Sequence, residues 1–186
     1  MFKRKIDQIL ENWLDEPKHK PLVVKGVRQC GKTSSIRAFA ESHFKHVVYL
    51  DFREHPDYKK FFEPNVSVAS IIMRISAALP AAEIEPHETC FVFDEIQDCP
   101  LARSSLKYFF LDGQYEVMCT GSLLGVHGYK TKDEKGGEQE SSIPVGFEHI
   151  VEMSRWILRN GSGLTESSRC ISITSRNVCK VKRLLM

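Results

Sequence analysis

The sequence lacks three patterns that are typical of other protein classes. It contains no apolar run that approaches the length of a membrane-spanning helix. Its first residues, MFKRKIDQILENWL, are charged and amphipathic, which differs from a secretory signal. Its six cysteines include no C-x-x-C pair, so a zinc site or a disulfide framework is not expected. We therefore expect a cytoplasmic protein that has no membrane partner.

A basic surface is also absent from most of the chain. The net charge is +2, but residues 154–186 hold seven basic residues and one acid, so residues 1–153 are mildly acidic. Nucleic-acid-binding domains usually carry a basic stripe with interleaved aromatic residues, and residues 1–153 have no such stripe. Nucleic-acid binding is therefore not expected, although the basic end of the chain leaves it open.

The most informative feature is the segment GVRQCGKTS, which fits the pattern G-x-x-x-x-G-K-[ST]. An apolar run at residues 22–24 precedes it and a helical pattern follows it, so the segment connects a strand to a helix. Backbone N–H groups in such a loop bind phosphates, and its lysine adds a positive charge. We predict an ATP-binding loop. Its predicted contact residues are Gly26, Val27, Arg28, Gln29, Cys30, Gly31, Lys32, Thr33 and Ser34.

Residues 89–95, TCFVFDE, form an apolar run that ends in two acids, as expected for a buried parallel strand. The Asp94 carboxylate is expected to hold Mg²⁺ through water, and the Thr33 hydroxyl to bind the same ion. Glu95 is expected to polarise the attacking water, and Lys32 to contact the β- and γ-phosphate oxygens. These residues predict Mg²⁺-dependent hydrolysis of ATP.

Helix and strand patterns alternate along the first two thirds of the chain. The predicted helices are residues 3–14, 35–43, 67–79 and 101–111, and the predicted strands are 22–24, 47–51, 89–93 and 115–119. This order favours an α/β fold with a mainly parallel central sheet, flanked by helices, that places the nucleotide at the carboxyl ends of its strands. Residues 128–142 are charged and glycine-rich, so we expect an exposed mobile loop there.

The sequence resembles a group of prokaryotic AAA-type ATPases, in which an N-terminal ATPase domain precedes a C-terminal domain of uncertain function. The segments that carry the resemblance lie between residues 3 and 153: LVVKGVRQCGKTS, VVYLDF, FVFDEIQDCP, SLKYFF, TGSLLG and PVGFEHIVEM. The resemblance implies an AAA-like three-layer P-loop NTPase domain over residues 1–153. In that family Lys32 and Thr33 would belong to the Walker A motif, and Asp94 and Glu95 to the Walker B motif.

The resemblance also implies a polar residue that touches the γ-phosphate or the water. Ser122, or alternatively Thr120, follows the strand at residues 115–119 and fits this role; the other interpretation is that both hydroxyls only cap the turn at Gly121. No arginine finger can be assigned. The candidates by residue type alone are Arg28, Arg37, Arg53 and Arg103.

The resemblance stops at Ser154. The family continues with a segment such as YPMDFEEFLWA and a second domain, whereas this chain continues with SRWILRNGSGLTESSRC, which is basic and serine-rich. One possible set of codons for SRWILRNGSGL encodes PMDFEEWFWA in another reading frame, which starts at the last nucleotide of the Ser154 codon. We therefore expect residues 154–186 to be a disordered or out-of-frame tail, and the chain to be truncated or frameshifted relative to the family.

Two functions remain open from the sequence. The first is an ATPase that uses ATP and Mg²⁺ as described above, as a homo-oligomer or with a protein client. The second is a nucleotide-binding remnant or regulatory switch that has little turnover because the C-terminal domain is absent.

Overall fold

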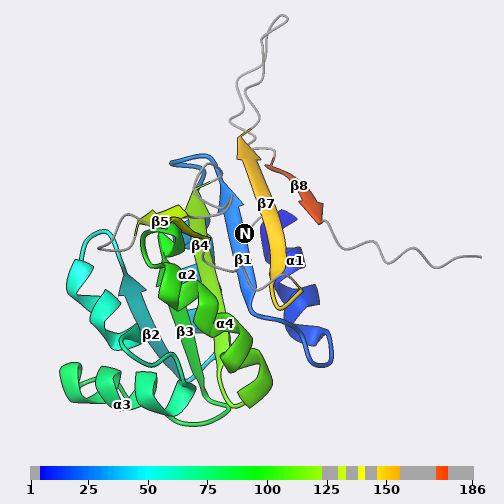
Figure 1. Ribbon diagram of the computed structural model, residues 1–186. Helices are drawn as coiled ribbons and strands as arrows, with labels where there is room; N and C mark the ends of the chain where they lie inside the picture. The colour runs from blue at the N-terminus through cyan, green and yellow to red at the C-terminus, as the bar shows by residue number, and fades with distance from the viewer. Residues whose placement is uncertain (1–4, 123–129, 133–137, 141–145, 156–170, 176–186) are drawn as a thin grey trace, which may run out of the picture.

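The computed structural model describes residues 5–122, 130–132, 138–140, 146–155 and 171–175 (Figure 1). Its main feature is a six-stranded sheet in the order β2-β3-β4-β1-β7-β8. The strands are β1 Leu22–Gly26, β2 His46–Asp51, β3 Thr89–Asp94, β4 Glu116–Ser122, β7 His149–Arg155 and β8 Ile171–Ser175. The first five strands in this order pair in parallel, and β8 lies antiparallel to β7 at the edge.

Helices cover both faces of this sheet. They are α1 Lys5–Asp15, α2 Lys32–His43, α3 Val68–Ala78 and α4 Pro100–Asp112, with two 3-10 helices, η1 Pro56–Phe62 and η2 Ile96–Asp98. Alternate residues of β3 enter different cores: Phe91 and Phe93 pack with α3, α4 and η1, whereas Cys90 and Val92 pack with α1 and α2. This arrangement confirms the prediction of a three-layer α/β fold with a mainly parallel central sheet.

The burial of β3 explains why its sequence shows no polar alternation. All of its residues are buried because both faces of the sheet are covered, and a strand in that position needs apolar residues throughout. The polar residue Asp94 comes at the carboxyl end of the strand, where the chain leaves the core. None of the described helices combines the length and the apolar composition that crossing a lipid bilayer requires.

Strand β7 was indicated in the sequence only by its resemblance to the family. It pairs with β1 along its length, with Leu22 opposite His149 and Gly26 opposite Met153. It therefore completes the central sheet on the side away from β4. Residues 146–155 thus belong structurally to the domain that contains the predicted ATP-binding loop.

Two segments differ from the predictions. Residues 128–142 were expected to form a mobile loop, but β5 Lys130–Lys132 and β6 Glu138–Glu140 pair as an antiparallel hairpin. The register places Lys130 opposite Glu140 and Lys132 opposite Glu138. Residues 133–137 lie outside the described residues.

The second segment is the predicted tail. No strand was expected after Ser154, but β7 continues to Arg155 and β8 pairs with it, with Ile171 opposite Arg155. The sequence ISITS of β8 alternates apolar and polar residues, which is the period of a strand and was overlooked. Residues 156–170 and 176–186 lie outside the described residues, and the origin of the tail stays a prediction.

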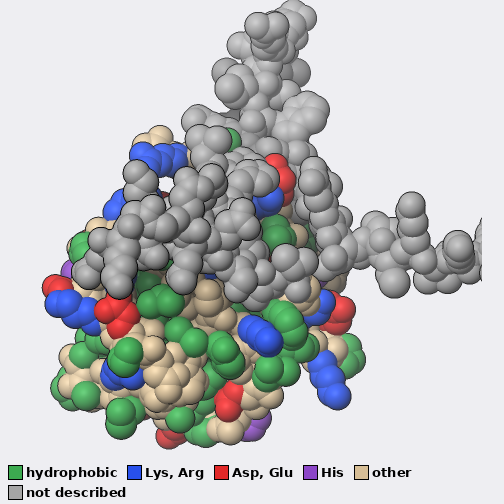
Figure 2. Space-filling view, viewed as in Figure 1, with side chains coloured by type: hydrophobic (Ala, Val, Ile, Leu, Met, Phe, Trp, Pro, Cys, Tyr) green, Lys and Arg blue, Asp and Glu red, His purple; other side chains and the backbone are tan. Residues whose placement is uncertain are grey.

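Apolar side chains also gather on one part of the surface. Figure 2 shows them over the lower part of the molecule, where α3 and α4 lie in Figure 1. On α4 the exposed residues Leu101, Tyr108 and Leu111 follow one another at helical spacing, and Met73 is exposed on α3. Because α4 buries Ala102, Leu106 and Phe109 on its inner side, this helix is apolar on both its inner and its outer side.

Candidate nucleotide site at the carboxyl ends of the strands

The predicted loop connects β1 to α2, and its two glycines are required for different reasons. A Cβ atom on Gly26 would lie 2.1 Å from the carbonyl oxygen of Met153 in β7, so only glycine allows β7 to approach this closely. Gly31 has φ +87°, a left-handed conformation that glycine adopts without strain, and α2 begins directly after it. The first backbone N–H groups of α2 therefore face the loop without helical acceptors.

Lys32, the first residue of α2, folds back over the loop. Its side chain is largely buried, and its Nζ donates hydrogen bonds to the carbonyl oxygens of Gly26 at 3.1 Å and Val27 at 2.8 Å. These two bonds hold the beginning of the loop against the start of the helix. They also keep a buried ammonium group supplied with acceptors, without which its burial would be costly.

Asp94 is the residue at which several elements meet. Its buried carboxylate accepts hydrogen bonds from the hydroxyl of Thr33 at 3.2 Å, from that of Tyr49 at 2.6 Å and from that of Thr120. The backbone N–H of Glu95 donates to the same carboxylate at 3.0 Å. Four donors from the loop helix, β2, β4 and the end of β3 therefore hold this side chain in place.

Glu95 follows Asp94 in a left-handed backbone conformation, with φ +52°. Its carboxylate lies 3.3 Å from Nη2 of Arg53 and accepts a hydrogen bond from the side-chain amide of Gln97. Arg53 also donates from Nε to Asp98 at 2.9 Å. The Asp98 hydrogen bond, aided by the charge of Glu95, raises the pKa of the Arg53 guanidinium. In this arrangement Glu95 is paired with a cation and an amide.

These elements border a cavity of about 600 Å³ that opens to the surface, a size that is typical of small-molecule sites. Its described lining consists of Arg28, Gln29, Gly31, Lys32, Thr33, Ser34, Arg37, Arg53 and Glu95. Four of these side chains are cationic and one is acidic, so the cavity suits a polyanion. The donors of the loop fit a phosphate chain, and the oxygens of Thr33 and Asp94 fit the ligand preference of Mg²⁺.

The structure brings most of the predicted site residues together, but not all of them. Six of the predicted site residues are not part of the described lining of the cavity: Gly26, Val27, Cys30, Asp94, Thr120 and Ser122. The Thr120 hydroxyl donates a hydrogen bond to the Asp94 carboxylate, and the backbone N–H of Ser122 donates one to the side-chain oxygen of Gln97 at 3.2 Å. Ser122 lies opposite Gly26 in the sheet, so it stands beside the first residue of the loop.

The four candidate arginines separate into two groups. Arg28, Arg37 and Arg53 line the cavity. Arg103 instead forms a buried, two-pronged ion pair with Glu148, with Nε to Oε1 at 2.9 Å and Nη2 to Oε2 at 3.0 Å. The interpretation of Arg103 as a candidate arginine finger is therefore wrong, because its charge is already used inside the protein.

Sequence reasoning missed Tyr49, Gln97 and the position of Arg37. The guanidinium of Arg37 lies 4.6 Å from the centre of the Tyr49 ring, and the Tyr49 hydroxyl reaches Asp94. Only the position of Tyr49 could have indicated its role, because it comes two residues before the end of a strand that pairs with β3. A motif of consecutive residues cannot contain this signal, since the contact depends on the order of strands in the sheet.

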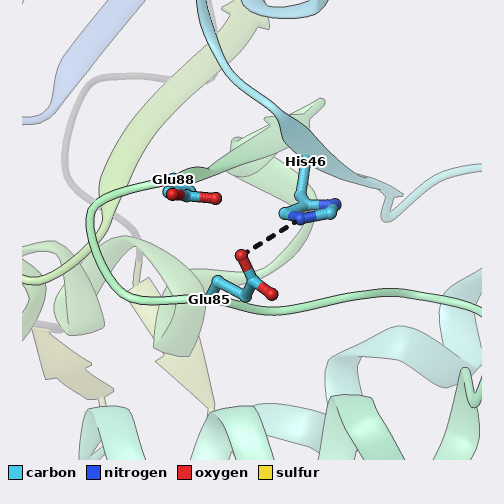
Figure 3. A group of neighbouring side chains, drawn as sticks. All are labelled: His46, Glu85 and Glu88. Atoms are coloured by element: carbon cyan, nitrogen blue, oxygen red, sulfur yellow. Dashed lines mark ion pairs between the residues drawn. The ribbon is translucent and has the colours of Figure 1, made fainter.

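A second group of ligand-type side chains lies at the opposite end of β2 (Figure 3). Ligand atoms of His46, Glu85 and Glu88 lie within 4.8 Å of one another. Lys45 Nζ, however, lies 2.7 Å from Oε2 of Glu85 and 2.8 Å from Oε2 of Glu88. The Lys45 hydrogen bond lowers the pKa of Glu85 to about 2. We interpret the group as an ion-pair cluster that fixes β2 to the segment before β3, because its acids already have a cation.

Comparison with protein-family models matches residues 18–142 to the family described as AAA domain. The matched range includes the loop, Asp94 and Glu95, and it spans more than half of the chain. No curated protein matches the sequence.

Proposed function

The chain belongs to the AAA domain family, with a P-loop domain that binds nucleotide, and we propose that it binds ATP with Mg²⁺ in the cavity described above and hydrolyses it. The observation that carries this proposal is the convergence at one cavity of the loop, three arginines and Glu95, with Asp94 joined to the loop by its 3.2 Å contact with Thr33. A cavity with this excess of positive charge favours a triphosphate over a neutral ligand.

The proposal gives each group one task. Backbone N–H groups of residues 26–34 and Lys32 bind the phosphates, and Lys32 exchanges its two carbonyl acceptors for phosphate oxygens. Thr33 and Asp94 hold Mg²⁺, which supplies charge neutralisation at the phosphates when it is bound. Glu95 orients and polarises the attacking water. The polar contact with the γ-phosphate or the water is proposed for Ser122, which lies opposite Gly26 in the sheet, with Thr120 as the alternative.

Thermal unfolding tests the binding part of the proposal. ATP with Mg²⁺ at about one hundred times the dissociation constant is expected to stabilise the protein by about 2.7 kcal/mol. Lys32→Ala should abolish this shift, because it removes the phosphate contact. The matched control is Lys60→Ala, which deletes an exposed lysine of η1 and should leave the shift intact. An unchanged melting temperature of the wild-type protein at saturating ATP would contradict the proposal.

A second candidate function is a nucleotide-binding switch with little turnover. It is favoured by the pairing of Glu95 with Arg53 and Gln97, which occupies the carboxylate that water would need. Parallel measurements of ATP binding and of phosphate release separate the two candidates. Tight binding without phosphate release would support the switch, and release that depends on Glu95 would support the ATPase.

We also propose a location, an oligomeric state and a kind of partner for this protein. A cytoplasmic location, a homo-oligomer and a protein client are compatible with the AAA domain family, and the exposed apolar residues of α4 offer a surface for a protein contact. Size-exclusion chromatography with and without ATP and Mg²⁺ tests the homo-oligomer. An elution volume that stays at the monomer position in both conditions would contradict it.

A further inference from the structure

Tyr49 is a residue of β2 that lies outside every motif but reaches into the centre of the site. Its hydroxyl donates a hydrogen bond of 2.6 Å to Oδ2 of Asp94. Tyr49 stands opposite Val92 in the pairing of β2 with β3, so its side chain runs along the sheet toward the end of β3. A bond of this length to a carboxylate belongs to the strong, charge-assisted class.

The two oxygens of Asp94 have different partners among the described residues. Oδ1 accepts from the hydroxyls of Thr33 and Thr120 and from the backbone N–H of Glu95. Oδ2 accepts from Tyr49. The Tyr49 bond therefore opposes rotation of the carboxylate and keeps Oδ1 turned toward the loop.

Tyr49 is the donor in its bond to Asp94, because a phenol, whose usual pKa is about 10, keeps its proton at physiological pH and a carboxylate can only accept. The guanidinium of Arg37 lies over the ring, 4.6 Å from its centre, and Arg37 lines the cavity. Tyr49 is thus held between a cavity arginine on one side and Asp94 on the other.

We propose that Tyr49 is a positioning residue for the metal ion of this site, because it holds the Asp94 carboxylate in the orientation that leaves Oδ1 facing Thr33. This inference rests on the proposed function, in which Thr33 and Asp94 bind Mg²⁺. Residues that hydrogen-bond to a metal-binding carboxylate typically contribute about 10- to 100-fold to metal affinity or activity. Removing the Tyr49 hydroxyl should therefore change how ATP affinity depends on the Mg²⁺ concentration, and it should leave phosphate binding without Mg²⁺ unchanged.

The test uses Tyr49→Phe, which removes the hydroxyl and keeps the ring under Arg37. Binding of a fluorescent ATP analogue is titrated over a range of Mg²⁺ concentrations and, separately, in EDTA. We expect the Mg²⁺ concentration at half-maximal effect to rise about tenfold or more, while affinity in EDTA stays at the wild-type value. Tyr115→Phe is the matched control, since it removes a hydroxyl from a half-buried tyrosine just before β4, at the other end of that strand from Thr120.

A second background shows whether Tyr49 acts through Asp94. The variant Asp94→Asn and the double variant Asp94→Asn with Tyr49→Phe should show the same dependence of analogue binding on Mg²⁺ concentration. An unchanged Mg²⁺ dependence in Tyr49→Phe would overturn the proposal. So would equal weakening with Mg²⁺ and in EDTA, or loss of folding in thermal unfolding, because each would make Tyr49 a structural residue. If the wild-type protein binds no analogue, the proposed function itself fails instead.

Discussion

The buried ion pair between Arg103 and Glu148 can be tested by removing one partner. Arg103 belongs to α4 and Glu148 immediately precedes β7, so the pair joins a helix of one layer to a strand of the central sheet. Their side chains are 4% and 3% exposed, and two parallel N–H to oxygen contacts connect them. Arg103→Met removes the charge but keeps much of the apolar length of the side chain, which leaves the Glu148 carboxylate buried without this partner.

Removing one partner of a buried ion pair typically costs about 3–5 kcal/mol, because the remaining charge loses its compensation. For a chain of this size, each kcal/mol lowers the melting temperature by about 2–4 °C, so Arg103→Met should melt about 6–20 °C below the wild-type protein. Replacing both partners by apolar residues is often neutral or stabilising. The double variant Arg103→Met with Glu148→Leu should therefore recover most of the loss.

Urea unfolding of the wild-type protein, both single variants and the double variant gives the coupling free energy of the pair. ATP binding, measured below the melting temperature, should be unchanged in Arg103→Met, since Arg103 is not part of the described cavity lining. A loss below about 1 kcal/mol in the single variants would refute the reasoning, because such a value is typical of pairs that remain in contact with water. A selective loss of phosphate release at unchanged stability would instead restore Arg103 as a catalytic candidate.

Four further predictions follow from the site and its surroundings. Glu95→Gln should lower phosphate release by about 10²- to 10⁴-fold and leave ATP affinity unchanged, as measured by phosphate release and equilibrium binding. Arg53→Ala should weaken ATP binding by about 10- to 150-fold, since a hydrogen bond to a charged group contributes about 1.5–3 kcal/mol; unchanged binding would show that Arg53 serves only Glu95. The lowered pKa of Glu85 contributes stability that is fully present above about pH 4.5 and is lost as the pH falls toward about 2, so acid unfolding of Lys45→Gln should show a weaker pH dependence in this window. The gene should encode a PMDFEE-like segment in the reading frame that starts at the last nucleotide of the Ser154 codon. If this frame encodes no such segment, the frameshift is contradicted.

The part of the site that could be predicted from the sequence is the part made by consecutive residues. The loop at residues 26–34 needs only a strand before it, a helix after it and two permissive glycines, and all of these are local. The pairing of Thr33 with Asp94 was also expected, because both motifs end at the same edge of a parallel sheet. Element types were predictable for the same reason, since apolar periodicity is a local property.

The remaining contacts depend on which strands become neighbours. Tyr49 reaches Asp94 because β2 pairs with β3, and no local pattern sets that order. By residue type Arg103 is equivalent to the other arginines, but the fold places Glu148, which is 45 positions away in the sequence, beside it. Gly26 was expected for phosphate binding alone, but the close approach of Met153 in β7 requires it independently. Each of these contacts joins residues that are separated by tens of positions.

Several charged groups of the site form hydrogen bonds or ion pairs within the protein. Lys32 donates to carbonyl oxygens of its own loop, Arg53 is divided between Glu95 and Asp98, and Asp94 is held by four donors. The two buried charged groups of the site, Lys32 and Asp94, therefore both have hydrogen-bond partners, which lowers the cost of their burial. It also means that a phosphate chain must replace these bonds and gains only the difference between the new and the old contacts. Affinity for the phosphate chain itself should therefore depend most on Lys32 and Arg53, which exchange partners, whereas Asp94 should act through the dependence of ATP binding on Mg²⁺.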